Sequence, residues 1–600
     1  MGPAEKGGNP MQEKLQKEVS LLRRRIDCAM GRALCEVLIK KATIADVANG
    51  KIIHDVDIAV DAGCIVDIGR HLKAWALHVR EAREGIYVPG FIDSHVHIES
   101  SFLSPAGFSD LVLPFGTTTA VVDPHEIANV AGKAGLDYML KVSASVPLDV
   151  RFMLSSCVPA SPFESSGATL AAEDLEPYFQ NERVLGLAEV MDVPAVLSGN
   201  EDMLKKLALA RIYGKVVDGH APLLFGPELA AYAAAGVRSD HEGSTPKELQ
   251  ERLAKGVFVN MREGSAAQNV AGLAPGVNDM NWVGVMLCSD DAGADDVSVN
   301  GHVNRALKKA VSRGINPLRA LAMAGINAAR HYGIKDKGLL APGFVADMVC
   351  VQDLKDFCVL EVWRAGKVVA QDGMLLQKAQ SEAVPESLLS TMHLEKVSPE
   401  AFAFKPKATS SVIGVIPGQI ITERREKTIR SDLEGFFDAR LNPGIVKIAV
   451  LERHHATGRI GLGLIGGYTA EGSFMEGALA TSVSHDAHNI IVAGDSDADM
   501  ALAVNTVRDM GGGMCAVKKG SVIATLALPI AGLMSDQPAL SVAQKKCLFR
   551  EAAVRELLIA EGVNPAMTLS FMALTAIPQI RITDRGLFDA EKFAFIDEKR

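Results

Sequence analysis

The spacing of apolar residues divides the 600-residue chain into segments of different structure. Residues 11–35 are rich in Lys, Glu, Leu and Arg, and they predict an exposed helix or a pair of short ones. Apolar residues then alternate over 56–60 and again over 64–68, with the turn-forming sequence Asp61-Ala62-Gly63 between them. This alternation predicts a β-hairpin.

A second β-rich stretch lies far downstream. Residues 346–351, 359–364 and 367–370 all have strand-like patterns. We expect the two β-rich stretches, 36–88 and 336–385, to form one small β-domain that brackets the chain between them.

The intervening residues 89–335 have a different pattern of apolar and polar positions. Short apolar runs recur between Gly, Pro and Ala/Leu-rich helical stretches; they are residues 119–122, 151–154, 184–187, 215–217 and 283–287. Strands and helices that alternate over this length predict a parallel (β/α)8 barrel. The predicted fold class is therefore α/β, with the barrel as the catalytic domain.

The remainder of the chain divides into a short linker and a further domain. Residues 386–409 are rich in Pro, Ser and Lys and predict the linker, while 410–600 predict an additional C-terminal α/β domain whose clearest strand is 445–450. Residues 1–35 stand apart as an N-terminal helical segment. The GxGxxG string within 461–467 is not a convincing dinucleotide fingerprint, because no clear helix opens from it.

Composition and charge exclude several classes of function. A net charge of −10 and a pI of about 5.9 argue against a nucleic-acid partner. No apolar run reaches the roughly 18–20 residues of a membrane span, and the polar N-terminus lacks a secretory signal. The nine cysteines contain no CxxC pair, which fits a reducing compartment. We expect a cytoplasmic protein without a membrane partner.

The strongest chemical signal is His95-Val96-His97. Alternate residues of a strand face the same side, so both imidazoles should point one way. They follow the apolar pair Phe91-Ile92, which places them near the carboxyl end of a strand, where barrel active sites lie. Two imidazoles on one face suit a divalent transition metal.

More histidines and acidic residues follow the later apolar runs in order. They are Asp123 and His125, Glu189, His220, His241, and Asp290 with Asp291. A single one of these would usually be a solvated loop residue or a helix cap. Their succession along a barrel-like pattern instead indicates a site built from several strand ends.

This order resembles the amidohydrolase superfamily over roughly residues 40–385. Four segments narrow the resemblance to the bacterial adenine deaminases: residues 89–101, 122–130, 239–242 and 288–291. In the tail, Glu452-Arg453-His454 and the segment 484–489 are similar to that family's own C-terminal domain. The resemblance then covers nearly the whole chain beyond about residue 35.

The resemblance implies hydrolytic deamination of adenine to hypoxanthine and ammonia, as part of purine salvage. It implies one or two divalent metals; we expect two ions, Mn or Fe with Zn possible, because the candidate ligands outnumber the roughly four positions of a tetrahedral site. The expected metal ligands are His95, His97, Glu189, His220, His241 and Asp290. The expected catalytic residues are Asp290, Glu189 and Glu242, and His125, Glu242 and Asp123 are expected to bind the purine. A homodimer is also implied.

One position departs from the pattern of related deaminases. Several carry a proton-shuttling Glu three residues after the histidine of strand five, where this chain has Leu223. Glu189, Glu242 and His125 are the alternatives. Two rival functions stay open: a cyclic-amide or N-acyl hydrolase on the same barrel, and a scaffold that has lost its chemistry.

The other histidines have plainer interpretations. We expect His302 to be structural. Surface or packing roles are expected for His54, His71, His78, His331 and His393. The C-terminal set (His454, His455, His485 and His488) more readily makes polar contacts between domains than a second metal site or a part of the pocket.

Overall fold

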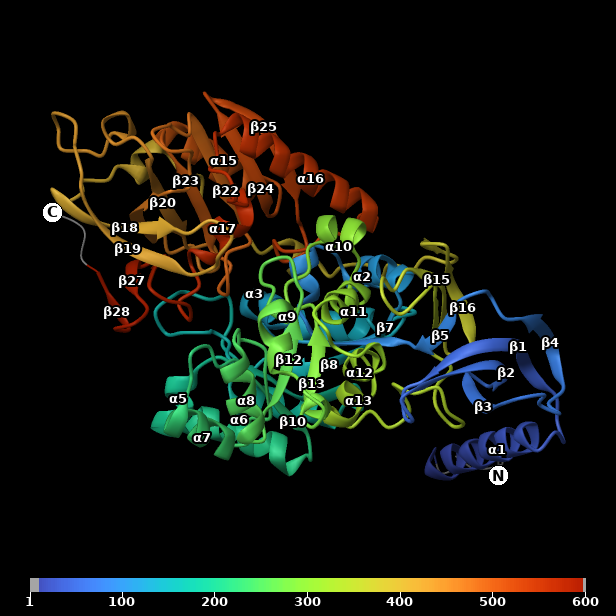
Figure 1. Cartoon of the computed structure of the whole chain (residues 1–600). Coiled ribbons are helices and arrows are strands. Elements are labelled where there is room, and N and C mark those ends of the chain that lie inside the picture. The colour runs from blue at the N-terminus through green and yellow to red at the C-terminus, as the bar shows by residue number, and fades with distance from the viewer. Residues whose placement is uncertain (1–9, 597–600) are drawn as a thin grey trace, which may run out of the picture.

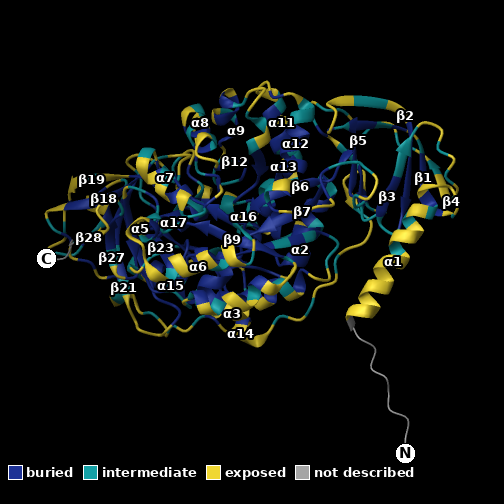
Figure 2. Ribbon diagram, turned by 90° about the horizontal axis from the view of Figure 1, so that it is seen from below, coloured by how far each residue is buried: buried dark blue, intermediate teal, exposed yellow. Residues whose placement is uncertain are grey.

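The computed structural model describes residues 10–596, and residues 1–9 of the predicted N-terminal segment lie outside the described part. α1 (Pro10–Ala29) is a single helix that packs along two strands of the first sheet (Figure 1). Most of its surface is exposed, as Figure 2 shows.

A nine-stranded sheet joins the two β-rich stretches of the sequence. Its strands are β1 (Cys35–Asp46), β2 (Lys51–Asp61), β3 (Cys64–Gly69), β4 (Ala76–Glu81), β5 (Ile86–Pro89), β14 (Met348–Val351), β15 (Val359–Arg364), β16 (Lys367–Gln371) and β17 (Met374–Leu375). The predicted hairpin is confirmed, because β2 pairs antiparallel with β3. The two stretches meet where Val88 of β5 lies opposite Val349 of β14.

Eight parallel strands follow in two hydrogen-bonded groups. The first group is β6 (Phe91–Val96), β7 (Thr117–Val122), β8 (Asp149–Leu154), β9 (Val184–Val190) and β10 (Val216–Gly219); the second is β11 (Ser239–Asp240), β12 (Phe258–Arg262) and β13 (Val285–Cys288). The last strand returns to the first, because the Asp290 amide just beyond β13 donates to the His95 carbonyl at 2.9 Å. The curled sheet is of the (β/α)8 type.

Helices cover this curled sheet (Figure 1). They are α2 (Pro105–Val112), α3 (His125–Val142), α4 (Ala172–Leu175), α5 (Val193–Ser198), α6 (Glu201–Ile212), α7 (Gly226–Ala234), α8 (Pro246–Ala254), α9 (Val270–Leu273), α10 (Ala294–Asn300), α11 (Val303–Ser312), α12 (Pro317–Met323) and α13 (Ile326–His331). β7 and β9 are buried along their whole length, as expected of parallel strands that are covered on both faces. Strand packing is tight at Gly186, where a Cβ would lie 2.1 Å from the Val216 carbonyl oxygen.

The C-terminal unit is built on an eight-stranded sheet in the order β19-β18-β21-β20-β23-β22-β24-β25. These strands are β18 (Thr409–Val415), β19 (Thr422–Thr428), β20 (Ile445–Leu451), β21 (Ile460–Gly466), β22 (Gly477–Thr481), β23 (Ile490–Gly494), β24 (Gly513–Lys518) and β25 (Ser521–Ala527). The remaining elements are α15 (Asp497–Asp509), α16 (Ala539–Glu556), α17 (Pro565–Phe571) and a small sheet of β26 (Ile580–Thr583), β27 (Gly586–Asp589) and β28 (Ala594–Phe595). The GxGxxG string falls within strand β21 and opens no helix.

The segment predicted as a linker is packed against its surroundings. It contains α14 (Glu386–Leu389), and both Leu388 and Phe402 are fully buried. Between residues 10 and 596, no helix combines the length and apolar character needed to cross a membrane.

Candidate functional site

The two histidines of the HxH motif meet at the carboxyl end of β6. His97 Nε2 lies 3.3 Å from both Glu189 Oε1 and Asp290 Oδ1. His95 Nε2 lies 3.8 Å and 3.5 Å from the same two oxygens. The imidazoles therefore converge on one place, as their alternate spacing predicts.

Glu189 stands at the centre of the histidine cluster. Its second oxygen, Oε2, lies 2.7 Å from His220 Nδ1 and 3.3 Å from His241 Nε2. These residues come from β9, from the turn after β10 and from the end of β11, so strand ends that are distant in sequence supply them. One carboxylate thus faces two histidines on each side.

This donor set fits a divalent metal. Imidazole and carboxylate groups without thiolates accept Mn, Fe or Zn. The Nε2 atoms of His95 and His220 are buried and have no hydrogen-bond partner among the described residues. His97 Nδ1 lies 3.0 Å from the Asp123 carbonyl oxygen, which can only accept, so this ring presents its Nε2 lone pair to the cluster.

Charge compensation keeps the central carboxylates ionised. Burial acts to raise the pKa of Glu189, but His241, His220 and His97 outweigh it and hold that pKa well below its usual value. Burial likewise opposes ionisation of Asp290, and Arg262 prevails in lowering its pKa. The surrounding histidines and Arg262 therefore favour the ionised form of both carboxylates.

Arg262 is a site residue that the sequence analysis missed. It ends β12, and its Nη1 donates to Asp290 Oδ2 at 2.7 Å and to Glu242 Oε1. Glu242 Oε1 also lies 3.5 Å from His241 Nε2. The sequence carries little signal for Arg262, because Asn260 interrupts the apolar run of β12 and the preceding strand, β11, has only two residues.

His125 and Asp123 lie beside the cluster. The His125 Nδ1 atom is 2.9 Å from Asp123 Oδ2 and 3.6 Å from Glu189 Oε1. His125 begins α3, directly after β7, so the strand end places its ring at the edge of the candidate metal centre. By contrast, Leu223 is exposed and does not line the cleft.

Residues of the C-terminal unit also lie beside the candidate metal centre. Glu126 on α3 bonds to His485 Nδ1 at 2.7 Å and to His488 Nε2. Asp486 Oδ1 lies 3.8 Å from His125 Nε2. His485 and His488 therefore do make polar contacts between the units, as expected, and His485 also lines the cleft together with Asp486.

A cleft of about 440 Å³ lies over the candidate metal centre. One wall is the cluster of histidines and carboxylates. The opposite wall is apolar and comes from the C-terminal unit: Ile420, Phe571, Leu574 and Ile577. Residues of both units thus line one cleft beside the candidate metal centre.

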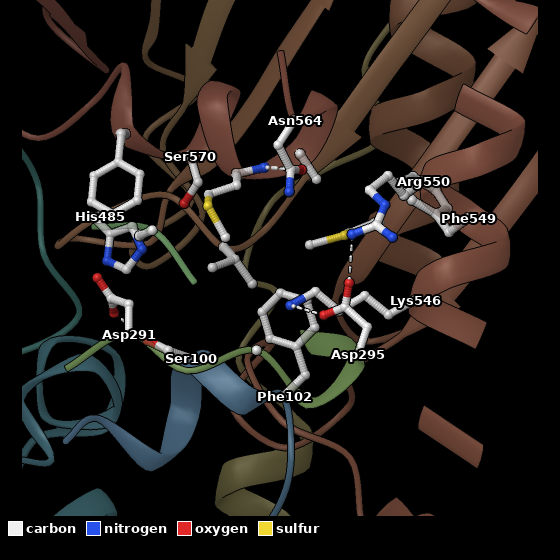
Figure 3. Close-up of a pocket in the computed structure, with 17 residues that line it drawn as sticks. Ser100, Phe102, Asp291, Asp295, His485, Lys546, Phe549, Arg550, Asn564 and Ser570 are labelled. Atoms are coloured by element: carbon white, nitrogen blue, oxygen red, sulfur yellow. Dashed lines mark hydrogen bonds and ion pairs between the residues drawn. The ribbon is translucent and has the colours of Figure 1, made fainter. Parts of the chain in front are cut away.

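A second, larger cavity of about 620 Å³ adjoins the cleft (Figure 3). The two share Ala266, Asp291, His485 and Phe571. Figure 3 shows Lys546 and Arg550 converging on Asp295 at the far end of this cavity, where both form ion pairs with it.

His302 has the structural role expected of it. Its Nδ1 lies 2.8 Å from Thr117 Oγ1, and burial lowers the pKa of the ring to about 3. The imidazole is therefore neutral, which suits a packing residue behind β6 rather than one that moves protons.

The comparisons with known proteins match both units that line the cleft. The model of the amidohydrolase family matches residues 86–369, and that of the adenine deaminase C-terminal domain matches residues 419–594. An adenine deaminase of Nitratidesulfovibrio vulgaris strain DP4 is 44% identical over 576 residues, which are 96% of this chain and 98% of that protein. One from Clostridium acetobutylicum is 42% identical over 574 residues, 95% of this chain and 99% of that protein. Among solved structures, the β-aspartyl dipeptidase of Fervidobacterium islandicum AW-1 is similar over 57% of this chain and 98% of its own, with a TM-score of 0.44 and 18% identity.

Proposed function

The chain belongs to the adenine deaminase family, and we propose that it hydrolyses adenine to hypoxanthine and ammonia. The observation that carries this proposal is the position of Glu189 between four histidines, with Asp290 beside it, on the floor of a cleft that the C-terminal unit closes. We place the reaction in purine salvage in the cytoplasm.

The proposed ligands of the metal are His95, His97, Glu189, His220, His241 and Asp290. We propose two divalent ions, Mn or Fe with Zn also compatible, because these six side chains exceed the roughly four positions of one tetrahedral site. When bound, such ions lower the pKa of water and polarise the bond under attack.

We assign the proton transfers and the binding of the purine to individual side chains. Asp290, held ionised by Arg262, is the base that accepts a proton from the attacking water. Glu242 lies between His241 and Arg262 and is the proposed carrier of protons to the purine ring and the leaving amine. His125, oriented by Asp123, holds the purine at the edge of the centre. The apolar wall excludes water from the ring faces.

Substrate assays separate this proposal from its rivals. The purified chain, loaded with Mn or Fe, is incubated with adenine, with hydantoin and with dihydrouracil. Release of ammonia and hypoxanthine from adenine alone supports the proposal. Ring opening of the cyclic amides would favour an amide hydrolase, and no turnover together with no bound metal would favour an inactive scaffold.

We also propose that the chain is a homodimer, with α1 as a contact surface. Leu15, Val19, Leu22 and Ile26 form an apolar stripe on this helix, and each is about half exposed. Their spacing of four, three and four residues is that of a coiled-coil seam.

A further inference from the structure

Asp486 is a buried carboxylate whose hydrogen bonding is incomplete. It lies in the loop between β22 and β23 and lines the cleft. Only 2% of the residue is exposed, and its Oδ2 has no hydrogen-bond partner among the described residues. Its Oδ1 lies 3.8 Å from both His125 Nε2 and His485 Nδ1, beyond hydrogen-bond reach. A buried acceptor of this kind is unfavourable unless something else bonds to it.

The two histidines of the loop that carries Asp486 both bond to another residue. Nδ1 of His485 faces Glu126, at 2.7 Å. His488 Nδ1 accepts from the Ser484 amide, so its Nε2 carries the proton that it gives to Glu126. Glu126 thus bonds to both His485 and His488. Asp486 lines the cleft and receives no hydrogen bond from either of these histidines.

Asp486 and Glu189 lie on opposite sides of the His125 ring. His125 Nδ1 is 3.6 Å from Glu189 Oε1, while its Nε2 is 3.8 Å from Asp486 Oδ1. The cleft therefore has a reactive end, at Glu189 and Asp290, and a second carboxylate, Asp486, beyond the His125 ring. Phe571, which also lines the cleft, stacks on His485 at 4.5 Å between ring centroids.

Adenine carries N–H donors at two ends of its ring system. Its N–H donors are the amino group on C6, which must lie at the reactive end, and one N–H on the five-membered ring. An acceptor at the other end of the cleft would meet that ring N–H. Because the free base carries the N–H and a 9-substituted purine does not, this contact distinguishes adenine from its nucleosides.

We infer that Asp486 is the specificity residue for the free base, and that its carboxylate accepts a hydrogen bond from the N–H of the five-membered ring. The inference rests on the proposed function and assigns this part of substrate recognition to the C-terminal unit. A substituent on N9 would remove the donor and press an apolar or ribosyl group against the buried Asp486 side chain. Sites built to bond a substrate N–H reject analogues that lack it by about 10⁴-fold.

The test compares adenine with 9-methyladenine in the metal-loaded full chain. Wild type, Asp486→Ala and Asp486→Asn are assayed for kcat and KM on both bases. We expect kcat/KM for adenine to fall about 100-fold in the variants, mainly through KM, while kcat/KM for 9-methyladenine stays level or rises. The selectivity between the two bases should therefore fall at least about 100-fold in both variants.

Matched controls separate recognition from folding. Asp495 lies in the same unit, where it accepts from the Glu476 and Gly477 amides, and Asp495→Asn should keep the wild-type selectivity. Metal content and thermal unfolding are measured for every variant. Equal losses on both bases, or unchanged selectivity in both Asp486 variants, would overturn the inference while leaving the proposed reaction intact. A wild-type chain that turns over no adenine would overturn both.

Discussion

The Nη1 atom of Arg262 lies 2.7 Å from Asp290 Oδ2 and also bonds to Glu242. One guanidinium therefore fixes the positions and the charges of two carboxylates that we assign to proton transfer. Replacing it with Gln removes the charge and leaves both anions less stabilised. We predict that Arg262→Gln lowers kcat about 10–100-fold, the range seen when a partner of a metal-site residue is lost.

Kinetics and metal analysis together check this prediction. Arg305, which bonds to Asp296, provides a matched control, and Arg305→Gln should retain kcat. Wild-type kcat in Arg262→Gln at unchanged metal content would show that Asp290 and Glu242 do not depend on this contact.

Much of the site was predictable because its residues follow recognisable strands. The alternation at His95 and His97 and the apolar runs before Glu189 and His220 each identify a strand end. Carboxyl ends of parallel strands meet at one edge of a curled sheet, so these residues had to converge. The same reasoning predicted the β-hairpin of β2 and β3.

The rest depends on contacts that local pattern does not encode. Arg262 ends a strand whose Asn260 and Arg262 interrupt the apolar run. His488 reaches Glu126 across 362 positions of sequence, which only the packing of the C-terminal unit brings about. The Pro- and Ser-rich composition of 386–409 predicted a linker, whereas the burial of Phe402 reflects tertiary packing.

A buried ion-pair network should make stability depend on acidic pH. Asp149 lies 3.0 Å from Lys337 and 2.9 Å from Arg151. Burial acts to raise the pKa of Asp149, but these cations outweigh it and lower that pKa below the value of about 3.9 in the unfolded chain. Asp149 thus stabilises the fold above about pH 4, and this contribution is lost as the pH falls toward the folded-state pKa.

Asp149→Asn should therefore reduce the free energy of unfolding by about 2 kcal/mol at pH 7, and this loss should shrink progressively as the pH falls below about 4. Urea unfolding at a series of pH values measures this difference. Asp356→Asn, which breaks an exposed pair with Lys308, should change little at any pH. A constant difference between Asp149→Asn and wild type from pH 7 to pH 3 would contradict the assigned role.

The stripe on α1 predicts a simple change of oligomeric state. Leu22→Glu places a charge in the centre of the proposed seam, where a second copy would bury it at considerable cost. Light scattering after size exclusion should then show a monomer where wild type is a dimer. Leu433→Glu, at a fully exposed position, should remain dimeric. A monomeric wild type, or a dimeric Leu22→Glu, would exclude α1 as the contact.

The central claim is that the cluster around Glu189 binds the metal that drives adenine deamination. The most direct measurement determines metal content and ammonia release from adenine in the same samples of wild type, His97→Ala and Asp290→Asn, before and after chelation and reloading with Mn or Fe. We predict up to two ions per wild-type chain, loss of turnover on chelation, recovery on reloading, and at least a 100-fold loss of kcat in both variants. Full turnover in either variant, or in the metal-free wild type, would contradict the account.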